Sequence, residues 1–139
     1  MSDSVHISQR PRLLIADDDP ATRLTLSEEL SRQFEIVGLA ANAEQAVALA
    51  EHQHPDIALL DAHISGGGGE WVSREIASLC PETAICALSS DELEHEVLDV
   101  LLAGAVAYTS RQVTAAELER ILWNSLRAHT RLRASAVAA

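Results

Sequence analysis

Apolar residues gather in five short runs along the chain, and after each run they recur with the spacing of a helix. The run Ile57–Leu60 has no polar face, which is typical of a strand that helices cover on both sides of a parallel sheet. Strands that alternate with helices in this way predict an α/β fold, a doubly wound five-stranded parallel sheet with five helices. The predicted strands cover residues 12–16, 34–40, 57–61, 83–88 and 105–109.

Residues with a preference for helix ends mark the predicted helices. Asp19 followed by Pro20 is an ordinary helix start, because aspartate caps well and proline is tolerated in the first turn. Asn42 and Asp91 are placed to cap the second and fourth helices, and Thr114–Glu117 is a capping box that opens the fifth. The sequence therefore gives each of these helices a defined start.

The chain has 139 residues, which is enough for one domain with a substantial core. We expect an N-terminal tail over residues 1–11, one domain over residues 12–128, and an Arg- and Ala-rich C-terminal tail or the start of a linker over residues 129–139. The end of the sequence at residue 139 leaves two forms open, a stand-alone domain and the first domain of a longer chain.

The charge and the hydropathy of the chain limit the kinds of partner that it is expected to bind. The formal net charge is −11, which argues against direct binding of nucleic acid and favours a cationic ligand or metal. No apolar run approaches the roughly 18 residues that cross a bilayer, and the N-terminus is polar, so we expect a cytoplasmic protein with no membrane partner. Cys80 and Cys86 are the only cysteines, and we expect a reduced, buried Cys86.

Polar residues that local structure does not explain lie just after predicted strands: Asp17, Asp18, Asp61, Ser89 and Arg111. Because the carboxyl ends of parallel strands share one edge of the sheet, these side chains should converge on one crevice. Taken alone, the stretch that contains Asp61 allows two interpretations. Asp61 is either a site residue or a cap for the following loop, since aspartate at a strand end commonly caps such a loop. The convergence with the other residues is the argument for a site.

Three carboxylates in a small space need a compensating cation. Oxygen ligands from carboxylates suit Mg²⁺, which is typically held by one or two carboxylates together with phosphate oxygens. Ser89 can bond a phosphoryl oxygen, Arg111 supplies positive charge, and the amides after Asp61 supply further donors. The pattern therefore predicts a magnesium site suited to phosphate chemistry.

Residues 12–127 resemble the receiver domain of two-component response regulators (CheY-like), a flavodoxin-like fold with strand order 2-1-3-4-5. Asp17–Asp18 matches the acidic pair of that family, Asp61 its phospho-accepting aspartate, and Ser89 its switch hydroxyl, followed by the small Ser90. Gly69 falls where the family has a glycine at the start of the third helix. Ala103–Ala105 and Tyr108 resemble the stretch that holds the family's rotating aromatic residue. These positions agree in order and spacing.

The resemblance implies a phosphorelay function: Asp61 takes a phosphoryl group from a sensor histidine kinase or a histidine phosphotransfer protein. It implies Mg²⁺ held by Asp17, Asp18, Asp61 and the backbone carbonyl of His63, whose side chain is expected only to line the site. It also implies a switch through Ser89 and Tyr108, with phosphoryl contacts from Arg111, Ser90 and Ala62. Such a domain catalyses its own phosphoryl transfer and hydrolysis and is otherwise a switch, with regulation of transcription as one fitting output.

The sequence departs from the receiver pattern at three places: the loop after the fifth strand, position 65 and the glycine run that follows it. Arg111 stands where the family has a nearly universal lysine, Gln112 replaces the proline that follows, and Ser65 replaces a proline four residues after the phospho-acceptor. Four consecutive glycines, Gly66–Gly69, stand where one or two are usual, and the chain contains no lysine. A guanidinium is larger than an ammonium and planar, so we expect Arg111 to reach the site from farther out and to contact it imperfectly.

These departures leave other functions open. The chain could be a receiver from a genome that favours arginine, or a pseudo-receiver that binds partners without phosphorylation. A remote alternative is a phosphatase of the haloacid dehalogenase type, because Asp17 and Asp19 resemble its Asp-x-Asp start. Against it, Ala21 replaces the expected threonine and no lysine is present.

The fourth predicted helix is more apolar than one contact with the sheet requires. Leu98 and Leu102 lie outside its inward face, and Trp123 on the fifth helix is a further surplus apolar side chain. We therefore expect a homodimer surface formed by the fourth helix, fifth strand and fifth helix.

Overall fold

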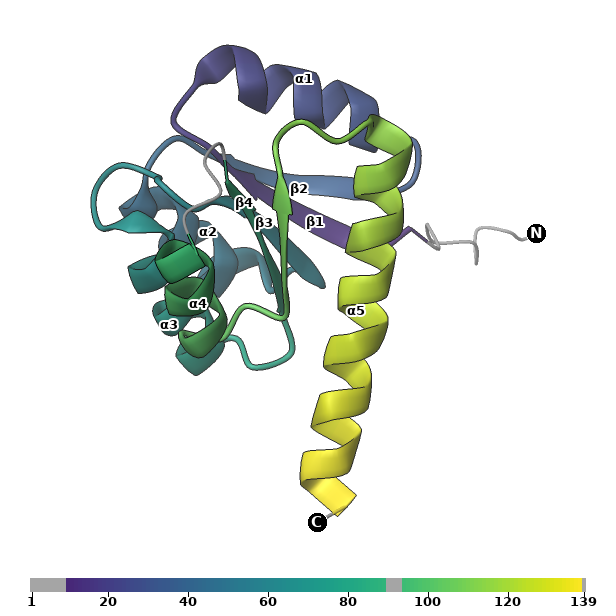
Figure 1. Ribbon diagram of the computed structural model, residues 1–139. Coiled ribbons are helices and arrows are strands. Elements are labelled where there is room, and N and C mark those ends of the chain that lie inside the picture. The colour runs from purple at the N-terminus through teal and green to yellow at the C-terminus, as the bar shows by residue number, and fades with distance from the viewer. Residues whose placement is uncertain (1–9, 90–93, 139) are drawn as a thin grey trace, which may run out of the picture.

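The computed structural model describes residues 10–89 and 94–138 (Figure 1). Its five strands form one parallel sheet in the order β2-β1-β3-β4-β5, so the predicted fold class and strand order are confirmed. The predicted strand boundaries are correct to within two residues. In chain order the elements are β1 Arg12–Ala16, α1 Pro20–Leu30, β2 Glu35–Ala40, α2 Ala43–Gln53, β3 Ile57–Asp61, α3 Gly68–Leu79, β4 Ala84–Ser89, α4 Glu94–Leu102, β5 Ala107–Ser110 and α5 Ala115–Ala138.

Two apolar layers hold the helices against the sheet. Successive side chains of a strand point to opposite faces, so Leu13 and Ile15 of β1 join the core with α1 and α5, whereas Leu14 and Ala16 join the core with α2, α3 and α4. Figure 1 shows the same division, with α1 and α5 on one side of the sheet. Since β3 is buried along its whole length, from Ile57 to Asp61, it is the centre of both layers.

The predicted helix starts are confirmed where the structure describes them. Asp19 accepts a hydrogen bond from Thr22 N at 3.3 Å, and Asn42 accepts one from Gln45 N at 2.9 Å. In the capping box at α5, Thr114 N donates to Glu117 Oε1 at 2.9 Å and Glu117 N donates to Thr114 Oγ1 at 3.1 Å. The predicted cap at Asp91 lies outside the described residues.

Helix α5 is longer than the sequence patterns predict. Residues 129–138, assigned above to a tail or linker, continue α5 without a break, and Figure 1 shows that they project past the sheet. The extension begins with a contact to the domain, because His129 Nε2 lies 2.7 Å from the carbonyl oxygen of Pro81. Alanine and arginine are strong helix formers, so this composition supports a helix as well as a tail.

The state of the cysteines agrees with expectation. Cys80 and Cys86 are buried and free, and burial raises the pKa of the Cys86 thiol to about 12. Within residues 10–89 and 94–138, no helix combines the length and the hydropathy needed to cross a membrane.

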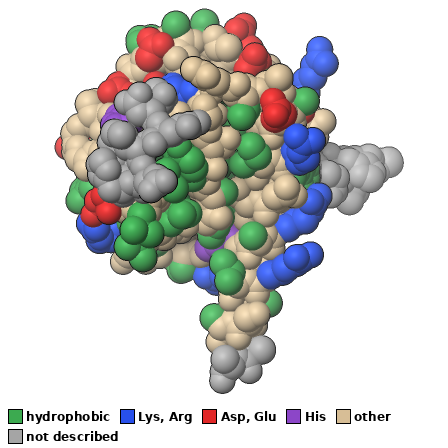
Figure 2. Space-filling model, in the orientation of Figure 1, with side chains coloured by type: hydrophobic (Ala, Val, Ile, Leu, Met, Phe, Trp, Pro, Cys, Tyr) green, Lys and Arg blue, Asp and Glu red, His purple; other side chains and the backbone are tan. Residues whose placement is uncertain are grey.

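A patch of leucines lies exposed on α4. Leu98 is 55% exposed and Leu102 is 77% exposed, with Leu101 beside them, and Figure 2 shows hydrophobic side chains gathered over α4. Trp123 does not join this patch, contrary to expectation. It packs against Phe34 with ring centroids 5.7 Å apart, beside the core between the sheet, α1 and α5. The reason is its position on the side of α5 that faces α1, away from α4.

Candidate functional site

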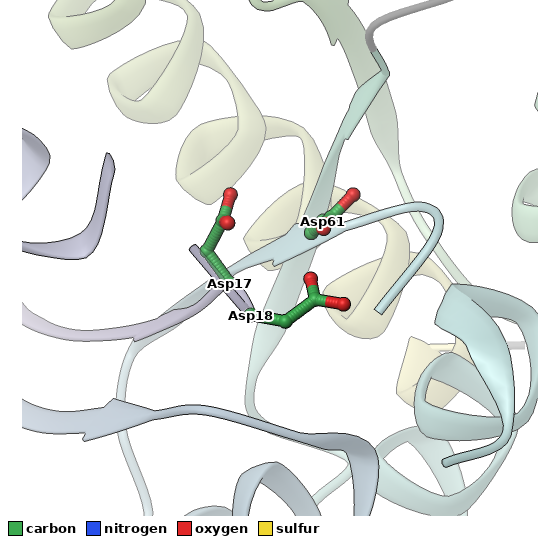
Figure 3. A group of neighbouring side chains, drawn as sticks. All are labelled: Asp17, Asp18 and Asp61. Carbon is green, nitrogen blue, oxygen red and sulfur yellow. The ribbon is translucent and has the colours of Figure 1, made fainter. Parts of the chain in front are cut away.

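Three carboxylates meet at the carboxyl edge of the sheet, as predicted. Asp17 and Asp18 follow β1 and Asp61 ends β3, and Figure 3 shows their side chains turned toward a common space. One oxygen from each lies within 4.8 Å of the others. They line a cleft of about 440 Å³ together with Asp19, Thr22, His63 and Arg111. Asp17 and Asp61 are only 1% and 4% exposed, which is rare for ionisable side chains without a partner.

Asp61 is held in place by the chain around it. The pairing of β3 with β4 continues to Asp61, which lies opposite Leu88. The following turn brings His63 N within 2.9 Å of Asp61 Oδ1, a side-chain-to-backbone bond that aspartate commonly makes two residues ahead. Arg111 Nη2 lies 3.0 Å from the same oxygen. Desolvation and the neighbouring Asp18 raise the pKa of Asp61, because both disfavour a second negative charge in the pocket.

Asp18 is the exposed member of the group. Its Oδ2 accepts a hydrogen bond from Ser65 N at 3.2 Å. The pKa of Asp18 is lowered, chiefly by a hydrogen bond with Asp61 and further by backbone donors. The two carboxyl groups therefore titrate as a pair, in which burial places the more weakly acidic site on Asp61.

Asp17 is fixed on three sides. Its carbonyl oxygen accepts from Arg23 Nη1 at 2.7 Å, its amide donates to Ala40 O at 3.0 Å, and its Oδ1 accepts from Asp19 N at 2.9 Å. Its Oδ2 lies 2.7 Å from Arg111 Nη2. This contact is an ion pair whose angles do not meet those of a hydrogen bond, so among the described residues Oδ2 has no hydrogen-bond donor.

The pocket fits a magnesium ion. Its carboxylates form an oxygen donor set, and Asp17 Oδ2 is a buried oxygen that accepts no hydrogen bond from the described residues. Two oxygens bound to one Mg²⁺ lie about 2.9 Å apart in neighbouring positions and about 4.2 Å apart in opposite ones, so the carboxylates would move closer together around the ion. The three aspartates and the His63 carbonyl are the residues that would hold the ion.

Arg111 reaches farther into the site than expected. Its backbone is anchored where Arg111 N donates to Ser89 O at 3.0 Å, and Gln112 N donates to Ser110 Oγ at 3.1 Å, a bond that a proline at this position could not make. From this loop the side chain, 24% exposed, contacts both Asp17 and Asp61. The expected contact with Asp61 is therefore present, and the contact with Asp17 adds to it.

The remaining predicted site residues are Ser89, Tyr108, Ser90 and Ala62. Ser89 is buried at the end of β4, and Tyr108 lies half-buried on β5 opposite Ala87. Ser90 lies outside the described residues. Ala62 was expected to offer its N–H to a phosphoryl group, but this N–H donates to Leu88 O at 2.8 Å. The physical reason is that the parallel hydrogen-bond ladder between β3 and β4 continues one residue past Asp61.

Sequence reasoning offered the amides after Asp61 as donors to a phosphoryl group but missed that two of them, His63 N and Ser65 N, donate to the carboxylates themselves. The first could have been found, because an aspartate at the start of a turn commonly binds the amide two residues ahead. The second donor exists because position 65 is not a proline. Ser65 therefore has a backbone N–H, and this N–H binds Asp18.

The glycine run shapes the wall beside Asp61. Gly67 caps α3 with a φ of 150°, a conformation that other residues rarely adopt. Gly69 lies against the chain next to Asp61, and a Cβ built there would be 2.8 Å from Ala62 Cα. The match of Gly69 to the receiver pattern thus has a steric basis.

Comparisons of this chain with known proteins agree on one protein family. The sequence model of the response regulator receiver domain matches residues 13–122. Transcriptional regulatory protein PdtaR of Mycobacterium tuberculosis is 34% identical over 110 residues, which make up 77% of this chain and 52% of PdtaR. The chain therefore spans about half the length of the curated relatives it matches.

Solved structures agree in fold. The signal receiver domain of a response regulator NarL from Mycobacterium tuberculosis has a TM-score of 0.82 at 24% identity, covering 86% of this chain and 98% of that chain. The receiver domain of a sensor histidine kinase from Pseudomonas aeruginosa has a TM-score of 0.76 at 28% identity, covering 84% of this chain and 98% of that one. That second structure has a magnesium ion coordinated in its active site cleft.

Proposed function

The chain belongs to the response regulator receiver domain family of two-component systems, and from this premise we propose that Asp61 accepts a phosphoryl group and that this switches the surface of α4, β5 and α5. The observation that carries the proposal is the buried Asp61 carboxylate, which lies against Asp17 and Asp18 and is held by His63 N and Arg111. A structural carboxylate would not need two further acidic side chains beside it. This membership replaces the haloacid dehalogenase alternative.

The proposed transfer uses groups that are already in place. An ionised oxygen of Asp61 attacks the phosphorus of a partner's phosphohistidine. The O–P bond forms as the P–N bond breaks, and the imidazole leaves with the electron pair and takes up a proton. Bound Mg²⁺ would supply positive charge that offsets the carboxylates and the phosphoryl oxygens. The chain orients the nucleophile through His63 N and contributes the charge of Arg111.

The proposed switch acts through Ser89 and Tyr108. Ser89 ends β4 one residue beyond the partner of Asp61 in the sheet, and its hydroxyl would move toward a new phosphoryl group. Tyr108 on the adjacent β5 would turn inward in response. Local charge at one edge of the sheet would then change the surface next to α4, as in other two-state switches.

Partner and output are part of the same proposal. The phosphoryl donor is a histidine kinase or a histidine phosphotransfer protein that presents phosphohistidine in the cytoplasm, which places this chain there. Relatives such as PdtaR are transcriptional regulators, so control of transcription is the proposed output. This domain would act as a switch and not as a turnover enzyme.

Binding of beryllofluoride, a phosphoryl mimic, tests the proposal. With Mg²⁺ present, we expect amide resonances of the loop after Asp61, of Ser89 and of β5 to shift together, because the mimic occupies the position of the phosphoryl group. Beryllofluoride without Mg²⁺ should leave the spectrum unchanged. An unchanged spectrum with both reagents would favour a pseudo-receiver that works without phosphorylation.

We also propose that the leucine patch of α4, Leu98 and Leu102, forms part of a homodimer interface in the activated state. Both side chains are more than half exposed, and apolar patches on soluble domains commonly mark interfaces. Leu102→Glu should raise the dimer dissociation constant at least about tenfold in sedimentation with beryllofluoride, through a charge buried in the contact. Leu24→Glu on α1, also exposed, is the matched control. Equal dissociation constants for the two variants would exclude this surface.

A further inference from the structure

Two of the three departures from the receiver pattern touch the carboxylates of the metal pocket. Arg111, in the position of the family's lysine, lies 2.7 Å from Asp17 Oδ2. Ser65, in the position of a proline, donates its N–H to Asp18 Oδ2 at 3.2 Å. A proline has no N–H to donate. Both substitutions therefore add a positively polarised group to an oxygen that the proposed magnesium ion would use.

Arg111 already supplies a counter-charge in the middle of the pocket. A single nitrogen, Nη2, lies 2.7 Å from Asp17 Oδ2 and 3.0 Å from Asp61 Oδ1, so it bridges the two buried carboxylates. The guanidinium is planar and always charged, and the anchored backbone of Arg111 directs it inward. In this arrangement the chain itself partly neutralises its acidic cluster.

A magnesium ion bound to the same carboxylate oxygens would be repelled by the positive charge of the Arg111 guanidinium. Ligand oxygens lie about 2.0–2.1 Å from Mg²⁺, and the guanidinium nitrogen is in direct contact with Asp17 Oδ2. Two cations on one carboxylate oxygen repel each other, so one of them has to move. Asp17 is the less mobile partner, because its backbone and its Oδ1 are held by Arg23, Ala40 and Asp19.

We infer that Arg111 is an internal cation that competes with Mg²⁺ for Asp17. In the metal-free chain Arg111 bridges Asp17 and Asp61, and magnesium binding requires the guanidinium to leave Asp17 Oδ2. The ion can use the second oxygen of Asp61, so the contact of Arg111 with Asp61 Oδ1 remains, and this directs Arg111 to the place where the phosphoryl group arrives. The chain therefore binds Mg²⁺ more weakly than its carboxylates alone would, and its phosphorylation requires a higher magnesium concentration. The inference rests on the proposed function, since it concerns the same pocket.

Calorimetric titration with MgCl₂ tests the competition without any phosphoryl donor. Arg111→Gln should bind Mg²⁺ about tenfold to a hundredfold more tightly than the wild type, the effect expected for removing a unit charge roughly 6 Å from a divalent ion in a partly solvated site. Arg74→Gln is the matched control, because it removes the same charge from the exposed surface of α3, where Arg74 pairs with Glu70. Its affinity should stay within about twofold of the wild type.

Thermal unfolding gives a second readout. Without metal, Arg111→Gln should unfold at a lower temperature than the wild type, because two buried carboxylates lose their counter-charge, and added Mg²⁺ should raise its melting temperature more than that of the wild type. Arg111→Lys keeps the charge on a flexible stem and should bind Mg²⁺ with an affinity between the other two.

The outcomes separate this inference from the proposed function. If neither Arg111→Gln nor Arg111→Lys binds Mg²⁺ more than about twofold more tightly than the wild type, the competition is wrong, even where acetyl phosphate still phosphorylates the wild type. If the wild type and both variants fail to bind Mg²⁺, both the inference and the proposed magnesium-dependent function are wrong. Absence of phosphorylation together with the expected order of Mg²⁺ affinities would overturn the function alone.

Discussion

Asp61→Asn is expected to abolish the phosphoryl adduct that acetyl phosphate forms on the wild type, which intact-mass spectrometry detects as a gain of about 80 Da. Asparagine keeps the shape of the side chain and its acceptor for His63 N, but a neutral amide oxygen is a poor nucleophile. We expect at least a hundredfold lower yield. Stability should change much less, since the hydrogen bond to His63 remains.

Asp56→Asn is the matched control, because Asp56 precedes the same strand at its opposite end. There its carboxylate accepts a hydrogen bond from Arg12 N at 2.8 Å, far from the pocket. The control variant should form the adduct like the wild type. An adduct that survives in Asp61→Asn would move the phosphorylation to another side chain.

Gly69→Ala is expected to destabilise the fold by about 1–3 kcal/mol, the range for forcing atoms into a closed space. The new Cβ would lie 2.8 Å from Ala62 Cα and 3.1 Å from Ala62 O, and these are backbone atoms that cannot rotate away. Because Ala62 follows Asp61, the displacement should also lower the rate of phosphorylation. Chemical denaturation and the acetyl phosphate assay measure the two effects.

Gly68→Ala is the control for backbone strain alone. A Cβ at Gly68 has open space around it, but the residue has a φ of 80°, which costs about 1 kcal/mol for alanine. Gly69→Ala should be the more damaging change for both stability and phosphorylation. If the two variants lose equal stability, the contact between Gly69 and Ala62 is not tight enough to shape the site.

The fold could be predicted because its signals are local. Continuous apolar runs such as Ile57–Leu60 indicate buried parallel strands, and capping residues such as Asn42 mark the starts of helices. Convergence of Asp17, Asp18 and Asp61 then follows from the parallel topology, and the structure brings their oxygens together. The end of α5 escaped prediction because an Ala- and Arg-rich sequence is compatible with both a helix and a tail.

The detailed contacts of the site were less predictable, because they depend on the angles of individual loops. The use of the Ala62 N–H in the sheet depends on how far the pairing of β3 with β4 extends. Likewise, the reach of Arg111 to Asp17 depends on the anchoring of its backbone at Ser89. Trp123 was misplaced because a helix pattern shows which residues share a face but not which neighbour that face meets.

The central claim is that this receiver domain is phosphorylated on Asp61, and locating the modified residue tests it most directly. Borohydride reduces an aspartyl phosphate to homoserine, and peptide sequencing by mass spectrometry then identifies the position that changed. After treatment with acetyl phosphate and Mg²⁺, we predict homoserine at position 61 and aspartate unchanged at positions 17, 18 and 19. Homoserine at another position, or at none, would contradict the account.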